Sequence, residues 1–149
     1  MDTYAKRYND IMLGISVKDK NKQELKTDKI TFYSAQEDWA KSQNKKAWDT
    51  MFFIVFDIAL SWCKKKASGV NIPNLVEKAK DAAILSMDLI KRNKGPNPQL
   101  DALITWVSYQ VTKVLYDQKL QMIEHEYSYD LMTDKDYHSI NSDKGDYNE

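Results

Sequence analysis

Residues 46–66 hold the feature that most limits how this chain can fold, an apolar stretch with the period of a helix. Its large side chains recur every three or four residues, which places them along one side of an α-helix. They are Trp48, Met51, Phe52, Val55, Phe56, Ala59, Trp62 and Cys63, and Phe53, Ile54, Ile58 and Leu60 widen the stripe. Asp57 interrupts the run, which is shorter than the roughly 20 apolar residues that a membrane span needs. The pattern predicts a buried central helix, and the three lysines that end it suit the negative pole of the helix dipole.

Two further helices are predicted after the central one. Residues 74–92 form an amphipathic pattern that starts at Asn74, with Glu77 completing a plausible cap, and its apolar stripe is Leu75, Val76, Ala79, Ala83, Met87 and Ile90. Residues 93–98 are a turn, and Asn97 followed by Pro98 predicts the start of the last long helix. That helix should run to about Glu126, with a stripe of Leu100, Leu103, Ile104, Val107, Val111, Val114, Leu115 and Met122.

The N-terminal third has weaker patterns. A short helix is expected at about residues 3–13, followed by an exposed loop that includes the lysine-rich stretch 18–29. Ser34 and Glu37 match the capping box in which both side chains bind backbone amides at a helix start. A second short helix is therefore expected at residues 35–43, anchored by Trp39.

Composition agrees with an all-α fold. The chain has 149 residues, a usual length for one domain, and only 4 glycines and 3 prolines, too few turn residues for a many-stranded β fold. We expect a compact helical bundle at residues 1–126, with three main helices and one or two short N-terminal helices. The single cysteine, Cys63, and the absence of an N-terminal apolar run are typical of a cytoplasmic protein.

Charge is divided unevenly between this domain and residues 127–149. The net charge is zero, but residues 1–126 carry +4 and residues 127–149 carry −4. The second segment has no apolar period and is rich in Asp, Ser, Asn and Tyr, a composition typical of a disordered acidic tail. A mildly basic domain permits contact with nucleic acid, although lysines on helices commonly form only a solvated face.

Signals for catalysis are few. Glu124, His125 and Glu126 are adjacent, so on a helix they point in different directions, and His138 lies in the tail. There is no glycine-rich phosphate loop and no nucleophile elbow. We therefore expect a protein that is not an enzyme and that has no metal site and no cofactor.

Aromatic side chains of the last helix suggest binding instead. Trp106 and Tyr109 are three residues apart and share a face, and Tyr116 follows on nearly the same line. Gln110, Lys113 and Lys119 accompany these rings. Aromatic rings beside amide and cationic groups can stack unpaired bases and hold phosphates, but the same spacing also suits rings that pack the core.

The order of these elements resembles region 2 of bacterial sigma factors, and more closely the small divergent sigma factors of bacteriophages that direct late transcription. The similarity covers about residues 48–127: an apolar helix ending in basic residues, a helix beginning Asn74-Leu75-Val76, a turn, and a stretch like the family's Tyr-Ala-Thr-Trp-Trp-Ile-Arg-Gln. Thr105, Trp106 and Gln110 are in register with that stretch.

The resemblance implies a transcription factor that docks on bacterial RNA polymerase and helps to recognise or melt the minus-ten promoter element. The helix of residues 74–92 would bind the clamp coiled coil of the polymerase. Its contact residues would be Leu75, Glu77, Lys78, Asp81, Ile84 and Asp88. The last helix would face the nontemplate strand, and its DNA-binding residues would be Trp106, Tyr109, Gln110, Lys113 and Lys119.

The sequence also departs from that family. Val107, Ser108 and Tyr109 replace the second Trp and the Ile-Arg, and Leu103 stands where an aromatic residue is expected. No second DNA-binding domain follows residue 126, so a tether would be needed, and the apolar islands 129–132 and 137–140 of the tail could bind the polymerase, a co-activator or a replication clamp. The alternative is a small helical protein-protein interaction module, oligomerising or inhibitory, without DNA contact.

Overall fold

The structure is a computed structural model that describes residues 2–100 and 102–126, with side chains described as far as Asp117. These residues form five α-helices and contain no strand. The helices are α1 (Thr3–Met12), α2 (Lys22–Ser42), α3 (Lys45–Lys66), α4 (Leu75–Lys91) and α5 (Leu103–Glu126), and a short 3-10 helix, η1, spans Pro98–Leu100. The all-α prediction is confirmed, whereas the predicted acidic tail lies outside the described residues.

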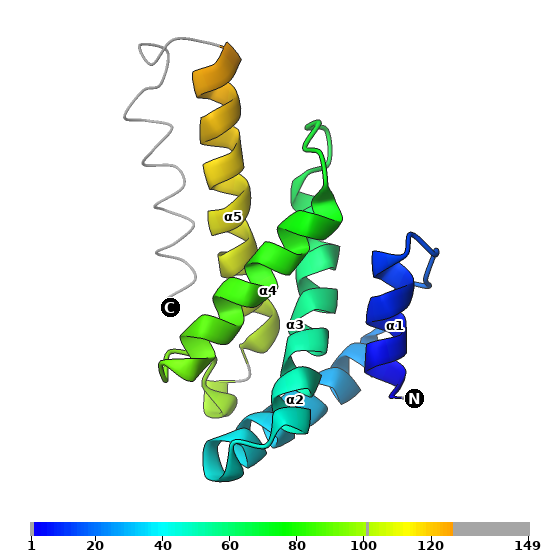
Figure 1. The fold of residues 1–149 in the computed structure, drawn as a ribbon, viewed down its shortest axis with the longest axis vertical. Helices are drawn as coiled ribbons and strands as arrows, with labels where there is room; N and C mark the ends of the chain where they lie inside the picture. The colour runs from blue at the N-terminus through cyan, green and yellow to red at the C-terminus, as the bar shows by residue number, and fades with distance from the viewer. Residues whose placement is uncertain (1, 101, 127–149) are drawn as a thin grey trace.

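Helix α3 is the centre of the bundle, as its sequence predicts. Each of the other four α-helices packs against it, and Figure 1 shows α3 between α1 on one side and α4 and α5 on the other. Its side chains Met51, Ile54, Val55 and Phe56 have no exposed surface. Of the described helices, none has the length and apolar character required to cross a bilayer.

Helix α2 corrects the prediction for the N-terminal third. The lysine-rich stretch is a loop only as far as Asn21, after which one helix runs from Lys22 to Ser42, so the bundle has four long helices rather than three. The side chain of Asn21 accepts a hydrogen bond from the backbone N–H of Glu24, and the Glu24 carboxylate accepts one from the backbone N–H of Asn21. The capping box is therefore here, and Ser34 is an exposed residue in the middle of the helix.

This difference in cap position leads to a first prediction. Replacing Asn21 with Ala should lower the free energy of unfolding by about 0.5–2 kcal/mol, because it removes the hydrogen bond to a backbone N–H that has no partner within the helix. Ser34→Ala is the matched control and should change the unfolding free energy by no more than about 0.5 kcal/mol, because an exposed position within a helix favours alanine. Urea denaturation measures both. If Ser34→Ala lowered the free energy of unfolding more than Asn21→Ala, the N-cap of α2 at Asn21 would be contradicted.

The connection into α5 also differs from the prediction. Asn97 does act as a cap, since its Oδ1 accepts a hydrogen bond from the backbone N–H of Gln99 at 2.9 Å, but it caps η1. The long helix begins five residues after Pro98, at Leu103. Leu100, predicted to belong to the buried stripe, is 72% exposed because it ends η1 rather than lying on a face of α5.

Candidate functional surfaces

Four of the residues predicted on the helix of residues 74–92 lie together on one exposed line of α4. Glu77, Asp81, Ile84 and Asp88 are all exposed, and their spacing of four, three and four residues puts them on one face of the helix. We call these four residues the α4 stripe. Ile84 is 54% exposed and so presents apolar surface between the acidic residues of the stripe.

The remaining predicted residues of α4 flank this stripe. Leu75 and Lys78 are half-buried at the start of the helix, and Leu75 packs against the core. Asp88 forms a surface ion pair with Arg92, 2.6 Å between Oδ2 and Nη2, in which both side chains are more than half exposed. Such a pair contributes about 0–1 kcal/mol and leaves both groups accessible to another molecule.

The opposite face of α4 fixes the stripe to the bundle. Ala79, Ala82 and Ala83 are fully buried there, and small side chains allow a close approach to α3 and α5. Ser86 is also fully buried, and its hydroxyl donates a hydrogen bond to the carbonyl of Ala82 at 2.8 Å. The stripe is thus presented by a helix whose inner side is closely packed.

Two of the predicted DNA-binding residues of α5 lie in the interior instead. Trp106 is 6% exposed and Gln110 is 1% exposed. The amide nitrogen of Gln110 donates to the carbonyl of Trp106 at 3.2 Å, and the neighbouring Val107 and Val111 have no exposed surface. In this conformation neither Trp106 nor Gln110 offers a surface on which a base could stack, because the broad apolar face of α5 turns both side chains into the core.

Tyr109 and Lys113 lie nearer to the surface. Both are half-buried, and the ammonium group of Lys113 is 4.5 Å from the centre of the Tyr109 ring, within the range of a cation–π contact. The side chain of Lys119 lies outside the described residues. Of the five residues predicted to bind DNA, the structure therefore brings Tyr109 and Lys113 together near the surface.

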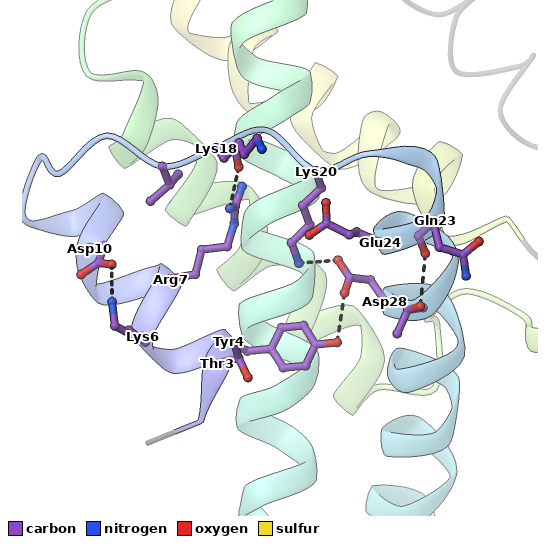
Figure 2. Close-up of a pocket in the computed structure, with 12 residues that line it drawn as sticks. Thr3, Tyr4, Lys6, Arg7, Asp10, Lys18, Lys20, Gln23, Glu24 and Asp28 are labelled. Carbon is purple, nitrogen blue, oxygen red and sulfur yellow. Dashed lines mark hydrogen bonds and ion pairs between the residues drawn. The ribbon is translucent and has the colours of Figure 1, made fainter.

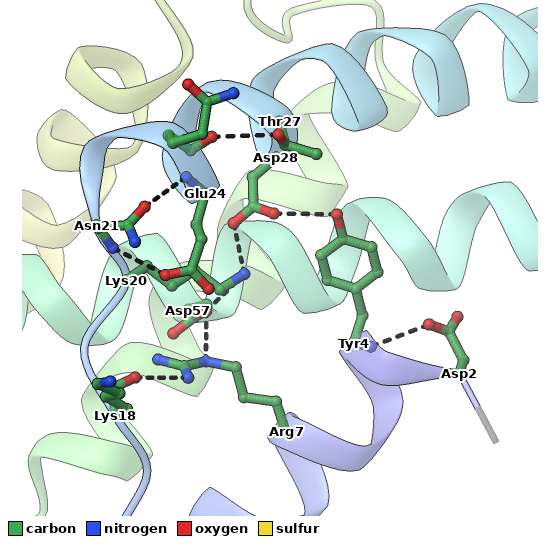
Figure 3. A network of polar contacts seen from close by, with 11 residues as sticks. Asp2, Tyr4, Arg7, Lys18, Lys20, Asn21, Glu24, Thr27, Asp28 and Asp57 are labelled. Atoms are coloured by element: carbon green, nitrogen blue, oxygen red, sulfur yellow. Dashed lines mark hydrogen bonds and ion pairs between the residues drawn. The ribbon is translucent and has the colours of Figure 1, made fainter.

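A buried ion network that was not predicted from the sequence joins α1, α2 and α3 (Figure 3). The Nε of Arg7 on α1 is 2.8 Å from a carboxylate oxygen of Asp57 on α3, and the Nζ of Lys20 is 3.2 Å from the same oxygen. Lys20 also pairs with Asp28 on α2, whose other oxygen accepts a hydrogen bond from the Tyr4 hydroxyl at 3.0 Å. Two cations and two carboxylates balance one another.

These side chains are poorly accessible to water. Asp28 is 4% exposed and Asp57 is 8% exposed. Burial raises the pKa of the Tyr4 hydroxyl above its usual value, and the hydrogen bond to Asp28 acts in the same direction. The one indication in the sequence is Asp57 itself, a charge in the middle of an apolar helix, which requires a buried partner.

A hollow of about 570 Å³ lies above this network, between α1 and α2 (Figure 2). Its charged lining includes Arg7, Lys20 and Asp28 from the network and the surface pair of Lys6 and Asp10, whose Nζ and Oδ2 atoms are 3.1 Å apart. The charges that form its floor are all paired within the protein. We therefore interpret the network as structural: its ion pairs hold α1 against α2 and α3.

Comparisons with known proteins identified no relative of this chain. No protein-family model, no curated protein and no solved structure matches the chain. Within residues 2–100 and 102–126, no group of three or more His, Cys, Asp or Glu side chains is placed to hold a metal ion.

Proposed function

We propose that this chain is a sigma-like transcription factor of bacteriophage type that docks on bacterial RNA polymerase through the α4 stripe. The observation that supports docking most directly is the exposure of Glu77, Asp81, Ile84 and Asp88 on one face of a helix whose opposite face is buried. The sequence resemblance to sigma region 2 supplies the partner, because the corresponding helix of that family binds the clamp coiled coil.

The chemistry of the stripe suits a helix that binds another helix. Ile84 offers an apolar anchor, and Asp81 and Asp88 lie one turn away on either side of it. An apolar centre with a polar rim is the usual arrangement at protein interfaces, in which the centre contributes most of the affinity and the charged rim contributes steering and register.

The DNA-binding part of the proposal rests on fewer residues than the sequence predicts. With Trp106 and Gln110 in the core, contact with the minus-ten element would fall to Tyr109 and Lys113, together with Lys119. A half-exposed tyrosine beside a lysine can contact one base and one phosphate of a nontemplate strand. Docking through α4 therefore has the stronger support.

The burial of Trp106 and Gln110 also favours a second function, without DNA contact. If α5 contributes only to the core, the chain is a protein-protein interaction module that occupies a partner through the α4 stripe without touching DNA. Fluorescence of a base analogue at the minus-ten position separates the two functions. An increase in the presence of the chain and core polymerase requires strand opening, whereas docking without any change in fluorescence supports the interaction module.

Charge reversal on the stripe tests docking itself. Glu77→Lys with Asp81→Lys should weaken co-purification with core RNA polymerase by roughly thirtyfold, the equivalent of about 2 kcal/mol, because reversing two charges of the rim turns attraction to the partner into repulsion. The matched control is Glu37→Lys with Asp49→Lys, which makes the same change in net charge at surface ion pairs of α2 and α3. Equal losses for both double variants would exclude a specific role for the stripe.

A further inference from the structure

A second surface of the bundle has the opposite charge. Two adjoining hollows of about 400 and 320 Å³ lie between α2, the second half of α3 and the first turn of α5, and both are lined by Leu25 and Ile104. We call them together the α2–α5 groove. Neither hollow is part of the α4 stripe, and the sequence pattern did not predict them.

The charged lining of the larger hollow consists of lysines alone. Lys22, Lys26 and Lys29 are four and three residues apart, which places them on one face of α2. Lys29 already has an interaction, whereas Lys22 and Lys26 are exposed and have no ion pair with any described residue. Ile30 lies beside them and is 65% exposed. The larger hollow thus combines unpaired positive charge with apolar surface.

The smaller hollow contains both signs of charge. Lys65 and the exposed Asp19 line it, as do Lys20 and Asp57, which pair with each other in the buried network. Its apolar lining includes Ile58 and Trp62. A ligand for the whole groove should therefore be acidic where it meets α2 and should carry apolar side chains as well.

We propose that residues 138–149 of this chain bind in the α2–α5 groove. This segment carries three acidic residues, Asp143, Asp146 and Glu149, and one lysine, and so has the charge that complements the lysines of α2. It also contains Ile140 and Tyr147, which match the apolar lining of the groove. An acidic segment with apolar side chains at intervals fits a groove of lysines, leucine and isoleucine in both respects.

The length of the chain permits this contact. Helix α5 has 24 residues, so the start of the tail is about 36 Å from the first turn of α5, where Ile104 lines the groove. The 23 residues that follow α5 can span about 76–83 Å when fully extended. Residues from about 138 onwards can therefore return to the groove, and being part of the same chain raises their effective concentration there.

A nucleic-acid strand is a less suitable occupant, because the rings of the groove are already engaged. The indole nitrogen of Trp62 donates to the carbonyl of Ile104 at 3.1 Å, and the Nζ atoms of Lys65 and Lys66 lie 5.2 and 5.3 Å from its ring centre. The hydroxyl of Tyr33 accepts a hydrogen bond from the backbone N–H of Leu103 at 3.1 Å. Base stacking, which contributes much of the affinity for single strands, would have to displace these contacts.

A spin label on the tail tests the proposal in the full chain. Ser139→Cys introduces a cysteine for labelling, whereas Cys63 should stay unmodified because burial raises the pKa of its thiol to about 11. Backbone amide signals of residues 22–30 and 104 should lose more than half of their intensity in the labelled protein. High salt should restore them, because it screens contacts between exposed charges.

Two charge variants complete the experiment. Lys22→Glu with Lys26→Glu should abolish the broadening, and Lys46→Glu with Lys94→Glu, which makes the same change in net charge at other exposed lysines, should leave it in place. Broadening that is absent or spread evenly over the surface would overturn the proposal. The proposal would also be overturned if the signals of these same amides changed only when single-stranded oligothymidine was added, because the groove would then bind nucleic acid rather than the tail. None of these outcomes depends on whether α4 binds RNA polymerase.

Discussion

Replacing Asp57 with Ala should lower the free energy of unfolding by about 3–5 kcal/mol, because it leaves two cations of the buried network without their shared carboxylate. Arg7 and Lys20 both contact the same oxygen of Asp57, at 2.8 and 3.2 Å. Their side chains are only 23% and 12% exposed, so water cannot fully replace the lost partner. Urea denaturation followed by circular dichroism measures the change.

The control for this prediction is an aspartate in a surface ion pair of the same helix. Asp49 of α3 pairs with Lys45 one turn away, at 2.9 Å, and the Lys45 side chain is 85% exposed. Asp49→Ala should cost no more than about 0.5 kcal/mol. If Asp57→Ala costs as little as Asp49→Ala, the network does not hold α1 and the α1–α2 loop against the bundle.

Replacing Trp106 with Ala should also lower the free energy of unfolding by about 3–5 kcal/mol, because it removes a large aromatic side chain from the core. Trp106 is 6% exposed, beside Val107 and Leu103, which have no exposed surface. Thermal or urea denaturation of the purified variant measures the loss. Any loss of promoter binding in this variant would follow from the loss of folded protein.

Tyr109→Ala separates this structural role from a binding role. Tyr109 is half-buried, so its replacement should cost less stability than that of Trp106 and should still affect strand opening if α5 faces DNA. A Trp106→Ala variant as stable as the parent chain would contradict the position of the indole in the core, and would return Trp106 to the surface as a candidate for base stacking.

The central part of the fold could be predicted from the sequence because its pattern is long and strong. An apolar helix of 22 residues has few alternatives, and the predicted start, Lys46, is one residue after the observed start, whereas the predicted end, Lys66, is the observed end. The amphipathic helix α4 was predicted almost as closely, since alanines and large apolar residues alternate with charges at helical spacing along it.

Helix α2 was not predicted in full because part of its inner face is polar. Asp28 occupies a buried position where an apolar residue would normally show the period, and Lys20 pairs with it from the preceding loop. A search for apolar stripes therefore treats residues 18–29 as a solvated loop. The pairing joins residues that are distant in the sequence, such as Arg7 and Asp57, and no local pattern contains that information.

The functional residues of α5 could not be separated from its core by spacing. Rings three residues apart share a side of a helix whether they bind DNA or pack in the core. Which side of α5 is buried depends on where α3 and α4 pack against it. Trp106 and Gln110 lie on the packed side, whereas Tyr109 and Lys113 lie at its edge. On α4, the charged residues already marked the outer face, so its predicted docking residues are mostly exposed.

Competition with the primary sigma factor for core RNA polymerase is the most direct test of docking through α4. The unlabelled chain should displace a fluorescent primary sigma factor from the core enzyme as its concentration rises, and the Glu77→Lys, Asp81→Lys variant should require a far higher concentration. If the folded parent chain leaves the primary sigma factor in place at saturating concentration, or if the variant competes equally well, the proposed function is contradicted.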